Sequence, residues 1–265
     1  MVPLEIYTVG YNLIKQNFDY KGSIHNYCNF ADRVTVAINT SDDSTWEAVD
    51  SLKQKYNNLN VVRCSIPYHN PLFDGMIKNF ALQNCILDYV IGLDMDERLP
   101  ATGRDKWESC IYIIDPMNTP YYAVSLPSID LCGNREQCKS VIGSKPYYLH
   151  RRRGVNRGVW GGAKLSNGKI DIKKSDTTEL IFTDGELVPT FWSQFNLEII
   201  KRQNLPYVLH TGWMDFDQRI KMNKWWAPHW TARAGENIND IILDKKELEE
   251  IPVVEHGLEL WGCQL

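Results

Sequence analysis

Apolar, β-rich runs alternate with helical patterns through the first hundred residues, and this alternation constrains the fold more than any other feature. Four runs read as strands and span residues 4–11, 33–39, 58–67 and 88–96. Helical spacing of apolar side chains follows in residues 44–57 and 73–85. Strands that alternate with helices of this length predict an α/β fold with a mainly parallel sheet covered on both faces. Ligands of such sheets bind at the carboxyl ends of the strands.

The second half of the chain is less regular. Strands are predicted at 121–129 and 145–154, and a flexible Gly-rich loop at 154–170. Helices are predicted at 191–204 and within 217–230, where Pro228 ends the second one. No repeat, low-complexity tract or Pro/Ser-rich linker separates the two halves. We therefore expect one domain over residues 1–265.

The composition is that of an ordinary globular protein, with 43% hydrophobic residues and a net charge of −4. That charge gives no reason to expect a general nucleic-acid or membrane binder, although a local basic patch is compatible with it. The seven cysteines lack zinc-site spacing and predict free thiols in a reducing compartment. The N-terminus has no signal-peptide pattern and no apolar run reaches the ~20 residues of a membrane helix. We expect a cytoplasmic protein without a transmembrane segment.

The fourth predicted strand runs into a cluster of carboxylates, Asp94, Asp96 and Glu97. If the strand continued through them, Asp94 and Asp96 would project from one face. Two carboxylates a few ångströms apart repel by about 1–4 kcal/mol at surface-like dielectric. A divalent cation relieves that repulsion, and Mg²⁺ is typically held by one or two carboxylates together with substrate phosphates. Mn²⁺ favours similar oxygen ligands and also accepts an imidazole. The alternative is that the acids cap a helix beginning near Leu99.

In this context the chain resembles the family 2-type glycosyltransferases of the GT-A fold. The segment "YVIGLDMDERLP" is similar to the family's strand that ends in Asp-x-Asp, and "AINTSDDST" to its nucleotide-binding turn. The pair Lys78-Asn79 is similar to a basic-Asn pair on the preceding helix, and "VLHTGW" to a C-terminal His-x-Gly element. The resemblance covers residues 4–100 and, more loosely, 145–225. It implies a Rossmann-like GT-A domain, with a nucleotide-sugar-binding half at about 1–100. The acceptor half, with C-terminal helices, would follow at about 101–265.

The same resemblance implies roles for individual residues. The metal, Mn²⁺ or Mg²⁺, would be held by Asp94, Asp96 and His210. The nucleotide sugar would contact Thr8, Gly10, Asn39, Asp42, Lys78 and Asp94. For His210, a hydrogen-bonded loop histidine without a metal is the alternative. Asn39 stands where the family usually has an acidic residue, so either Asp42 and Asp43 supply that contact to the base or the contact differs in this chain.

The resemblance does not supply a catalytic base, because "VWGGAKL" replaces the His-Glu pair of some relatives. An inverting transfer needs a carboxylate that takes the proton of the acceptor hydroxyl. Candidates in the acceptor half are Asp130, Asp184 and Glu186, with Asp130 preferred because it closes a predicted strand. For each of them, an ordinary loop carboxylate is the alternative, and a retaining reaction stays open.

Basic and aromatic residues of the second half are candidates for binding the acceptor. Arg151 and Arg153, in a run with Arg152, could hold phosphates, or could form a solvated turn. Trp225 and Trp226 lie among basic residues in a segment that also holds Trp213, Arg219 and Trp230. Aromatic faces stack on sugars and bases, whereas tryptophans at helical spacing often belong to a core.

Taken together, the residues predict a metal-dependent glycosyltransferase, with hexosyl or pentosyl transfer from a nucleotide sugar whose base we expect to be uracil. The acceptor would be a glycan, lipid-linked sugar or protein, and a hydroxylated base in DNA stays open. One alternative is a nucleotidyltransferase acting on a sugar phosphate, although "TVGYNLIKQN" lacks the Gly-rich basic loop of that class. The other is a non-catalytic module that binds nucleotides or carbohydrates.

Overall fold

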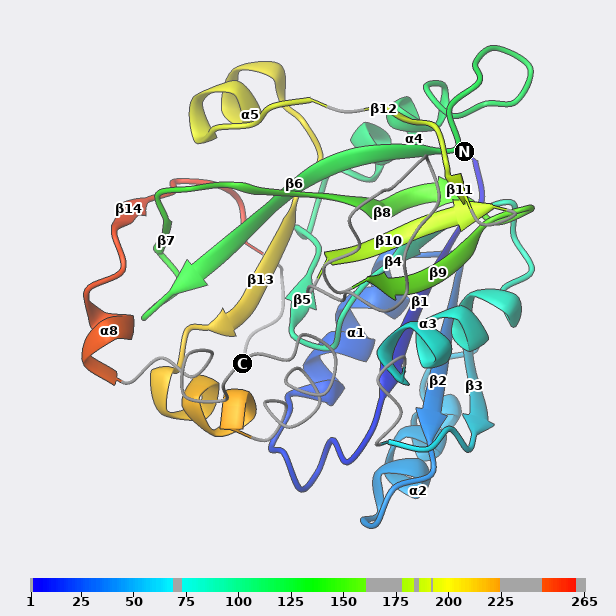
Figure 1. Cartoon of the computed structure of the whole chain (residues 1–265), viewed down its shortest axis with the longest axis vertical. Coiled ribbons are helices and arrows are strands. Elements are labelled where there is room, and N and C mark those ends of the chain that lie inside the picture. Colours follow the sequence, from blue (N-terminus) through cyan, green and yellow to red (C-terminus); the bar gives the residue numbers. More distant parts are fainter. Residues whose placement is uncertain are drawn as a thin grey trace.

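The structure is a computed structural model of the chain, and it describes residues 2–68, 73–160, 178–183, 186–191, 193–224 and 245–260. In the described residues a mixed sheet has the strand order β14-β7-β6-β8-β4-β1-β2-β3, and helices lie against it (Figure 1). The sheet continues from the first half of the chain into the second. No helix in the described residues is long and apolar enough to span a membrane.

Four neighbouring strands of the first half are parallel. They are β1 (Leu4–Gly10), β2 (Arg33–Asn39), β3 (Leu59–Cys64) and β4 (Tyr89–Gly92). The helices of this half are α1 (Tyr20–Phe30), α2 (Thr45–Asp50), the 3-10 helix η1 (Ser51–Gln54) and α3 (Phe73–Gln83). The predicted α/β architecture, with a parallel centre and flanking helices, is confirmed.

The second half extends this sheet, mostly with antiparallel strands. Its elements are β5 (Glu97–Arg98), α4 (Arg104–Ile111), β6 (Ala123–Cys132), β7 (Gln137–Lys139), β8 (Gly143–Arg151), β12 (Thr190–Phe191), α5 (Leu197–Gln203), β13 (Val208–Trp213), α8 (Lys245–Glu249) and β14 (Val253–Glu255). A separate small sheet holds β9 (Asn156–Trp160), β10 (Thr178–Thr183) and β11 (Glu186–Leu187). Strand β13 pairs in parallel with β6 and antiparallel with β5. This double pairing brings residues 208–213 to the carboxylate cluster.

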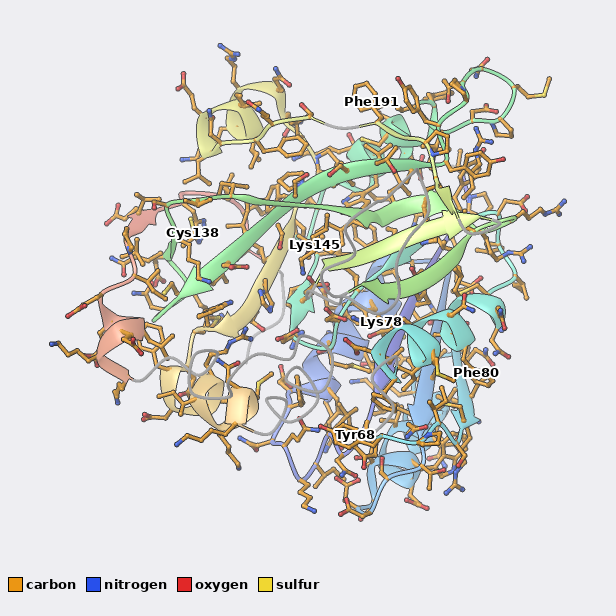
Figure 2. All side chains as sticks on the ribbon, viewed as in Figure 1. Tyr68, Lys78, Phe80, Cys138, Lys145 and Phe191 are labelled. Carbon is orange, nitrogen blue, oxygen red and sulfur yellow. The ribbon has the colours of Figure 1, made fainter. Side chains whose placement is uncertain are left out.

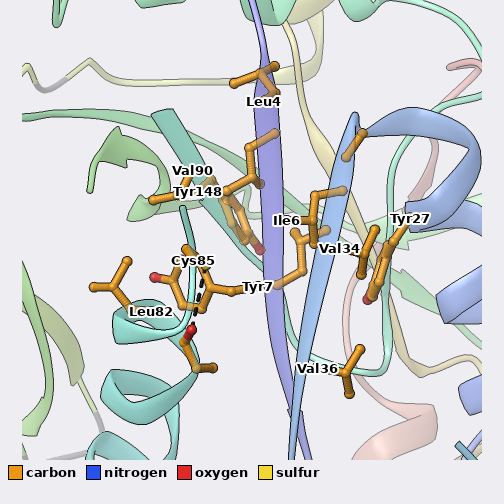
Figure 3. Close-up of a cluster of buried hydrophobic side chains, with 14 of the residues drawn as sticks. Leu4, Ile6, Tyr7, Tyr27, Val34, Val36, Leu82, Cys85, Val90 and Tyr148 are labelled. Carbon is orange, nitrogen blue, oxygen red and sulfur yellow. Dashed lines mark hydrogen bonds between the residues drawn. The ribbon is translucent and has the colours of Figure 1, made fainter. Parts of the chain in front are cut away.

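The core of the first half forms on both faces of the parallel strands. Successive residues of β1 point to opposite faces, so Ile6 packs on the side of Tyr27 from α1, and Tyr7 on the side of Leu82 from α3 (Figure 3). All four side chains are at most 1% exposed. Burying a large apolar side chain contributes about 1.5–3 kcal/mol relative to leaving it exposed. The two-sided core therefore fixes the plane of the sheet and the place where its strands end.

Several sequence predictions differ from the structure at element ends. The strand predicted at 88–96 stops at Gly92, and the helix predicted at 191–204 begins only at Leu197. The helix predicted at 44–57 is split into α2 and η1, which ends at Gln54. The Gly-rich loop predicted at 154–170 contains strand β9, and its residues 161–170 lie outside the described residues.

Several elements went unpredicted. They are the helices α1, α4 and α8 and the strands β5, β7, β10, β11, β12, β13 and β14. The prediction of free thiols is confirmed for the six described cysteines, all of which are buried and unbridged. Cys263 lies outside the described residues.

Candidate active site

A short turn between β4 and β5 carries the carboxylate cluster. The Tyr27 hydroxyl donates to the carbonyl oxygens of Asp94, at 2.5 Å, and of Glu97, at 2.8 Å. Glu97 Oε2 in turn accepts the backbone N–H of Asp94 at 2.8 Å. The turn is thus closed by Glu97, the first residue of β5, and is fixed to α1 through Tyr27. The expectation that Asp94 and Asp96 project from one face of a continued strand is wrong, because the strand has already ended at Gly92.

The two aspartates consequently have different partners. Asp94 Oδ1 lies 2.8 Å from Nζ of Lys78, a residue of α3 whose side chain is 7% exposed. Asp96 Oδ2 lies 3.0 Å from Nε2 of His210. Lys78 and Lys145, a lysine of β8, both lie near the centre of the molecule in Figure 2. The sequence prediction that brought Lys78, Asp94, Asp96 and His210 to one place agrees with these contacts.

His210 lies between two carboxylates because β13 lies between two strands. In the strand registers, His210 is opposite Glu97 of β5 and opposite Asp130 of β6. Its ring joins Asp96 through Nε2 and Asp130 through Nδ1, which is 2.8 Å from Asp130 Oδ1. Thr211 donates from both its N–H and its hydroxyl to the Asp96 carbonyl, each at 2.7 Å. These bonds fix the imidazole relative to the acidic turn.

Cations surround this group of carboxylates. Asp130 Oδ2 lies 3.1 Å from Lys139 Nζ, and that ammonium stands 3.0 Å from the centre of the Trp213 ring. The Arg219 guanidinium lies 4.1 Å from the same ring centre. Arg219 Nε is buried and has no hydrogen-bond partner among the described residues. A buried guanidinium with an unused donor is suited to an anionic ligand.

Glu97 is fully buried, unlike the two aspartates. Its Oε1 accepts from Lys145 Nζ at 2.8 Å and from the Tyr148 hydroxyl. Burial raises the pKa of this carboxyl, although Lys145 acts in the opposite direction. Because its Oε2 accepts the Asp94 N–H, Glu97 stabilises the turn.

The two carboxylates that flank His210 set its protonation. Burial alone would lower the pKa of His210, but Asp96 and Asp130 outweigh it and raise the pKa to about 9. Burial likewise acts to raise the pKa of Asp96, and His210 and Arg219 outweigh it and hold this pKa below its usual range. The pKa of Asp130 is lowered in the same way, with His210 and Lys139 overcoming its burial.

A pH dependence of stability follows for the metal-free protein. The folded pKa of His210, about 9, lies above the unfolded value of 6.5. The stabilisation is therefore complete below about pH 6.5 and is lost as the pH rises through about 9, with a limit of about 3 kcal/mol. Urea unfolding at pH 6, 7.5 and 9 should show this fall, and His210→Gln should flatten it. Equal unfolding free energies across the three pH values would contradict it.

The donor set fits a divalent ion. Adjacent ligands of an octahedral ion with bonds of about 2.1 Å lie about 3 Å apart, and Asp96 Oδ2 and His210 Nε2 are separated by 3.0 Å. Gly212 leaves space beside them, since a Cβ there would stand 2.5 Å from Oδ2 and 2.9 Å from Nε2. The described residues hold no group of three or more His, Cys, Asp or Glu side chains placed to bind a metal. Among the described residues, Asp96 and His210 are therefore the two donors that lie together, as for ions that also bind substrate phosphates. Metal binding by Asp94 stays a prediction.

The predicted nucleotide-binding residues cluster at the carboxyl ends of β1 and β2. Thr8 is 1% exposed and its hydroxyl has no hydrogen-bond partner among the described residues. Gly10 packs closely, since a Cβ there would stand 2.7 Å from the Leu13 side chain. The Asn39 amide is bonded to both the N–H and the C=O of Ile66, and Asp42 Oδ2 is paired with Lys15 Nζ. Their contacts with a nucleotide stay predictions.

The structure does not bring the predicted arginines to the acids. Arg151 pairs in register with Tyr89, at the start of β4, whereas the acids follow its end. Its guanidinium binds the carbonyls of Ile114 and Thr119, and Arg153 is paired with Asp88. Neither set of contacts involves the acidic turn, and acceptor binding by Arg151 and Arg153 stays a prediction.

Other predicted residues lie at or beyond the limits of the described side chains. Glu186 belongs to β11, of which the backbone is described. Asp184, Trp225, Trp226 and Trp230 lie outside the described residues. Residues 216–224, which include Arg219, are helical, as predicted for this segment.

Sequence reasoning missed Lys139 and gave no role to Lys145. Neither residue belongs to a motif, and each reaches the site through antiparallel pairing of β6 with β7 and β8. Lys139 follows Cys138, which is opposite Leu131 in that pairing, next to Asp130. Only knowledge of this register could have found it.

Comparisons with known proteins complete the description of the site. No protein-family model matches the chain, and no curated protein matches it. Among solved structures, S. aureus TarS 1-349 in complex with UDP-GlcNAc matches at 15% identity and a TM-score of 0.36, covering 57% of this chain and 46% of that one. The mannosyltransferase PcManGT from Pyrobaculum calidifontis, in complex with GDP-Man and Mn²⁺, matches at 14% identity and a TM-score of 0.42, covering 89% and 66%.

A third match is the glycosyltransferase GlyE of Streptococcus pneumoniae, at 12% identity and a TM-score of 0.31, covering 46% of this chain and 29% of that one. The first solved structure found, S. aureus TarS at 16% identity and a TM-score of 0.35, covers 57% of this chain, which in turn spans 28% of its length. All these TM-scores lie below 0.5, so the likeness by itself assigns no activity to this chain.

Proposed function

We propose that this protein is a metal-dependent glycosyltransferase that moves a sugar from a nucleotide-sugar donor to a hydroxyl acceptor. The observation that carries the proposal is the pair of donor atoms, Asp96 Oδ2 and His210 Nε2, 3.0 Å apart beyond the end of a parallel strand. The space beside Gly212 adds to it. Binding at the carboxyl ends of parallel strands is the rule for α/β sheets.

Each residue of the site has a part in this reaction. Asp96 and His210 would hold Mn²⁺ or Mg²⁺, and the ion would neutralise charge on the departing diphosphate. The Arg219 guanidinium, whose Nη1 lies on the Gly212 side of the donor pair, would bind the diphosphate directly. Lys78 would approach the same group while holding Asp94. The Thr8 hydroxyl, for which the described part of the chain supplies no hydrogen-bond partner, would bond to the nucleoside.

The charges of the site favour joint binding of metal and donor. Each carboxylate of the site already has a cation beside it. Lys78 lies beside Asp94, Arg219 beside Asp96, Lys145 beside Glu97, and Lys139 beside Asp130. Protonated His210 adds a fifth positive charge, so a divalent cation alone would add to an excess that the diphosphate would offset. We therefore propose that nucleotide and metal each strengthen the binding of the other.

The acceptor side is less constrained. Asp130 has both carboxylate oxygens engaged, so Glu186 is the residue to test as the group that takes the acceptor proton. We propose a UDP-sugar as donor and a glycan or protein as acceptor. A hydroxylated base in nucleic acid is the alternative acceptor.

The proposal predicts metal-dependent turnover of a nucleotide sugar. The protein is incubated with a panel of UDP- and GDP-sugars and Mn²⁺ or Mg²⁺, and release of the nucleoside diphosphate is measured. One donor class should turn over, EDTA should abolish turnover, and the nucleotide should bind at least about tenfold more tightly with Mn²⁺. Pyrophosphate formation from a nucleoside triphosphate and a sugar phosphate would instead indicate a nucleotidyltransferase. Neither turnover nor metal-dependent nucleotide binding would overturn the proposal.

A further inference from the structure

We propose that Asp130 and Lys139 act as a positioning pair that fixes the orientation and tautomer of His210 for metal binding. This inference rests on the proposed function above. The contacts form a continuous chain, from Lys139 Nζ to Asp130 Oδ2 at 3.1 Å and from Asp130 Oδ1 to His210 Nδ1 at 2.8 Å. The chain ends at His210 Nε2, which lies 3.0 Å from Asp96 Oδ2.

The first step of the argument concerns the two ring nitrogens of His210. A neutral imidazole donates from one nitrogen and offers a lone pair on the other. Asp130 is an acceptor at Nδ1, so a ring that gives up one proton to bind a metal would keep the other at Nδ1. The Nε2 lone pair, on the side of Asp96 Oδ2, would then be offered to the metal. Hydrogen bonds of this kind orient metal-binding histidines and raise their basicity.

The second step concerns how rigidly the pair is held. Asp130 is opposite His210 in the parallel pairing of β6 and β13, and Lys139 ends the adjacent strand β7. The Lys139 ammonium also stands 3.0 Å from the centre of the Trp213 ring, three residues beyond His210 on β13. Two contacts therefore connect β13 to the pair, one through the imidazole and one through the indole. A side chain held from neighbouring strands keeps its geometry better than one on a loop.

The third step separates this role from that of a catalytic base. A base must present a carboxylate oxygen to the acceptor hydroxyl. In Asp130, Oδ1 is occupied by His210 and Oδ2 by Lys139, and its side chain is 25% exposed. The geometry thus places Asp130 behind the imidazole, where it acts on the metal through His210.

The test measures metal affinity separately from turnover. Binding of Mn²⁺ is followed by the electron paramagnetic resonance signal of free Mn²⁺, with UDP or GDP present, and kcat is measured at saturating Mn²⁺. Asp130→Asn should weaken Mn²⁺ binding by about 10- to 100-fold, and excess Mn²⁺ should restore most of kcat. Lys139→Met should weaken it by less, about two- to tenfold. Asp88→Asn, a carboxylate paired with Arg153 near the start of β4, is the matched control and should change neither quantity.

The unsubstituted protein supplies a readout that does not depend on the folding of a variant. In its diamagnetic complex with Mg²⁺ and UDP or GDP, nitrogen-15 NMR of the His210 ring should show the proton on Nδ1. A proton on Nε2 instead would overturn the inference.

Two results with the variants would also overturn it. One is unchanged Mn²⁺ affinity in Asp130→Asn with a loss of kcat that Mn²⁺ cannot restore, which would make Asp130 the catalytic base. The other is an unchanged affinity together with unchanged kcat. Absence of any Mn²⁺–nucleotide complex in the unsubstituted protein would overturn the proposed function itself, and the inference with it.

Discussion

Replacing Asp96 with asparagine should reduce transfer from the nucleotide sugar by about a thousandfold or more while the protein stays folded. Asparagine keeps the size of the side chain but removes the negative charge that interacts with His210 and would bind the metal. The Asp96 side chain is 15% exposed, and His210 would keep its bond to Asp130. The loss should therefore appear in turnover and in Mn²⁺ affinity rather than in the core.

The measurements are nucleoside diphosphate release, Mn²⁺ binding and thermal unfolding, each compared with Asp88→Asn. That control removes an exposed carboxylate paired with Arg153 and should behave like the unsubstituted protein. Full activity of Asp96→Asn would show that the metal assignment is wrong. Equal losses of turnover and Mn²⁺ affinity in Asp88→Asn would show that the net charge of the protein, and not the Asp96 carboxylate, is responsible.

Adding a single methyl group at Gly212 should reduce turnover by about a hundredfold. In Gly212→Ala, the new Cβ would stand 2.5 Å from Asp96 Oδ2 and 2.9 Å from His210 Nε2, so at least one donor must move. Displacements of about 1 Å can reduce the rate of a positioned reaction by this factor. Unfolding should be easier by about 1–3 kcal/mol, the usual cost of overpacking.

A matched glycine on another strand provides the control for that change. A Cβ at Gly143 of β8 would stand 3.5 Å from the Ser128 side chain, which is an ordinary contact. Gly143→Ala should therefore keep both turnover and Mn²⁺ affinity. Crystals of Gly212→Ala with Mn²⁺ and nucleotide should show the donor pair moved apart, and an unmoved pair with full activity would contradict the expectation.

Local sequence patterns were sufficient to predict the centre of the sheet. The first four strands are short apolar runs bounded by polar residues, and the structure places β1 to β4 within those runs. Strand ends were less predictable. Asp94 and Asp96 were expected to continue β4, but the Tyr27 hydroxyl and the Glu97 carboxylate close a turn there. The hydroxyl comes from α1, a helix that was itself unpredicted.

The site residues that belong to short sequence motifs could be predicted, whereas those brought to the site by strand pairing could not. Asp96 and His210 belong to short motifs, and their meeting agrees with the prediction. Asp130 was singled out as a base, whereas its contacts are with His210 and Lys139. The difference depends on the register between β13 and β6, which no short motif encodes. The same limit applies to Arg219, which reaches the site only because β13 first brings residues 208–213 there.

The placement of β13 between β5 and β6 also determines when, during folding, the proposed metal site can form. Asp96 and Asp130 lie 114 and 80 residues before His210 in the chain, and β13 must enter between β5 and β6 to join them. Contacts between residues so far apart form slowly, because long loops must close first. During synthesis the parallel strands and the acidic turn would therefore be complete well before the imidazole arrives. A chain that ends before residue 208 would hold the acids and lack the histidine, so metal binding and donor use would begin only with the last strand of the site.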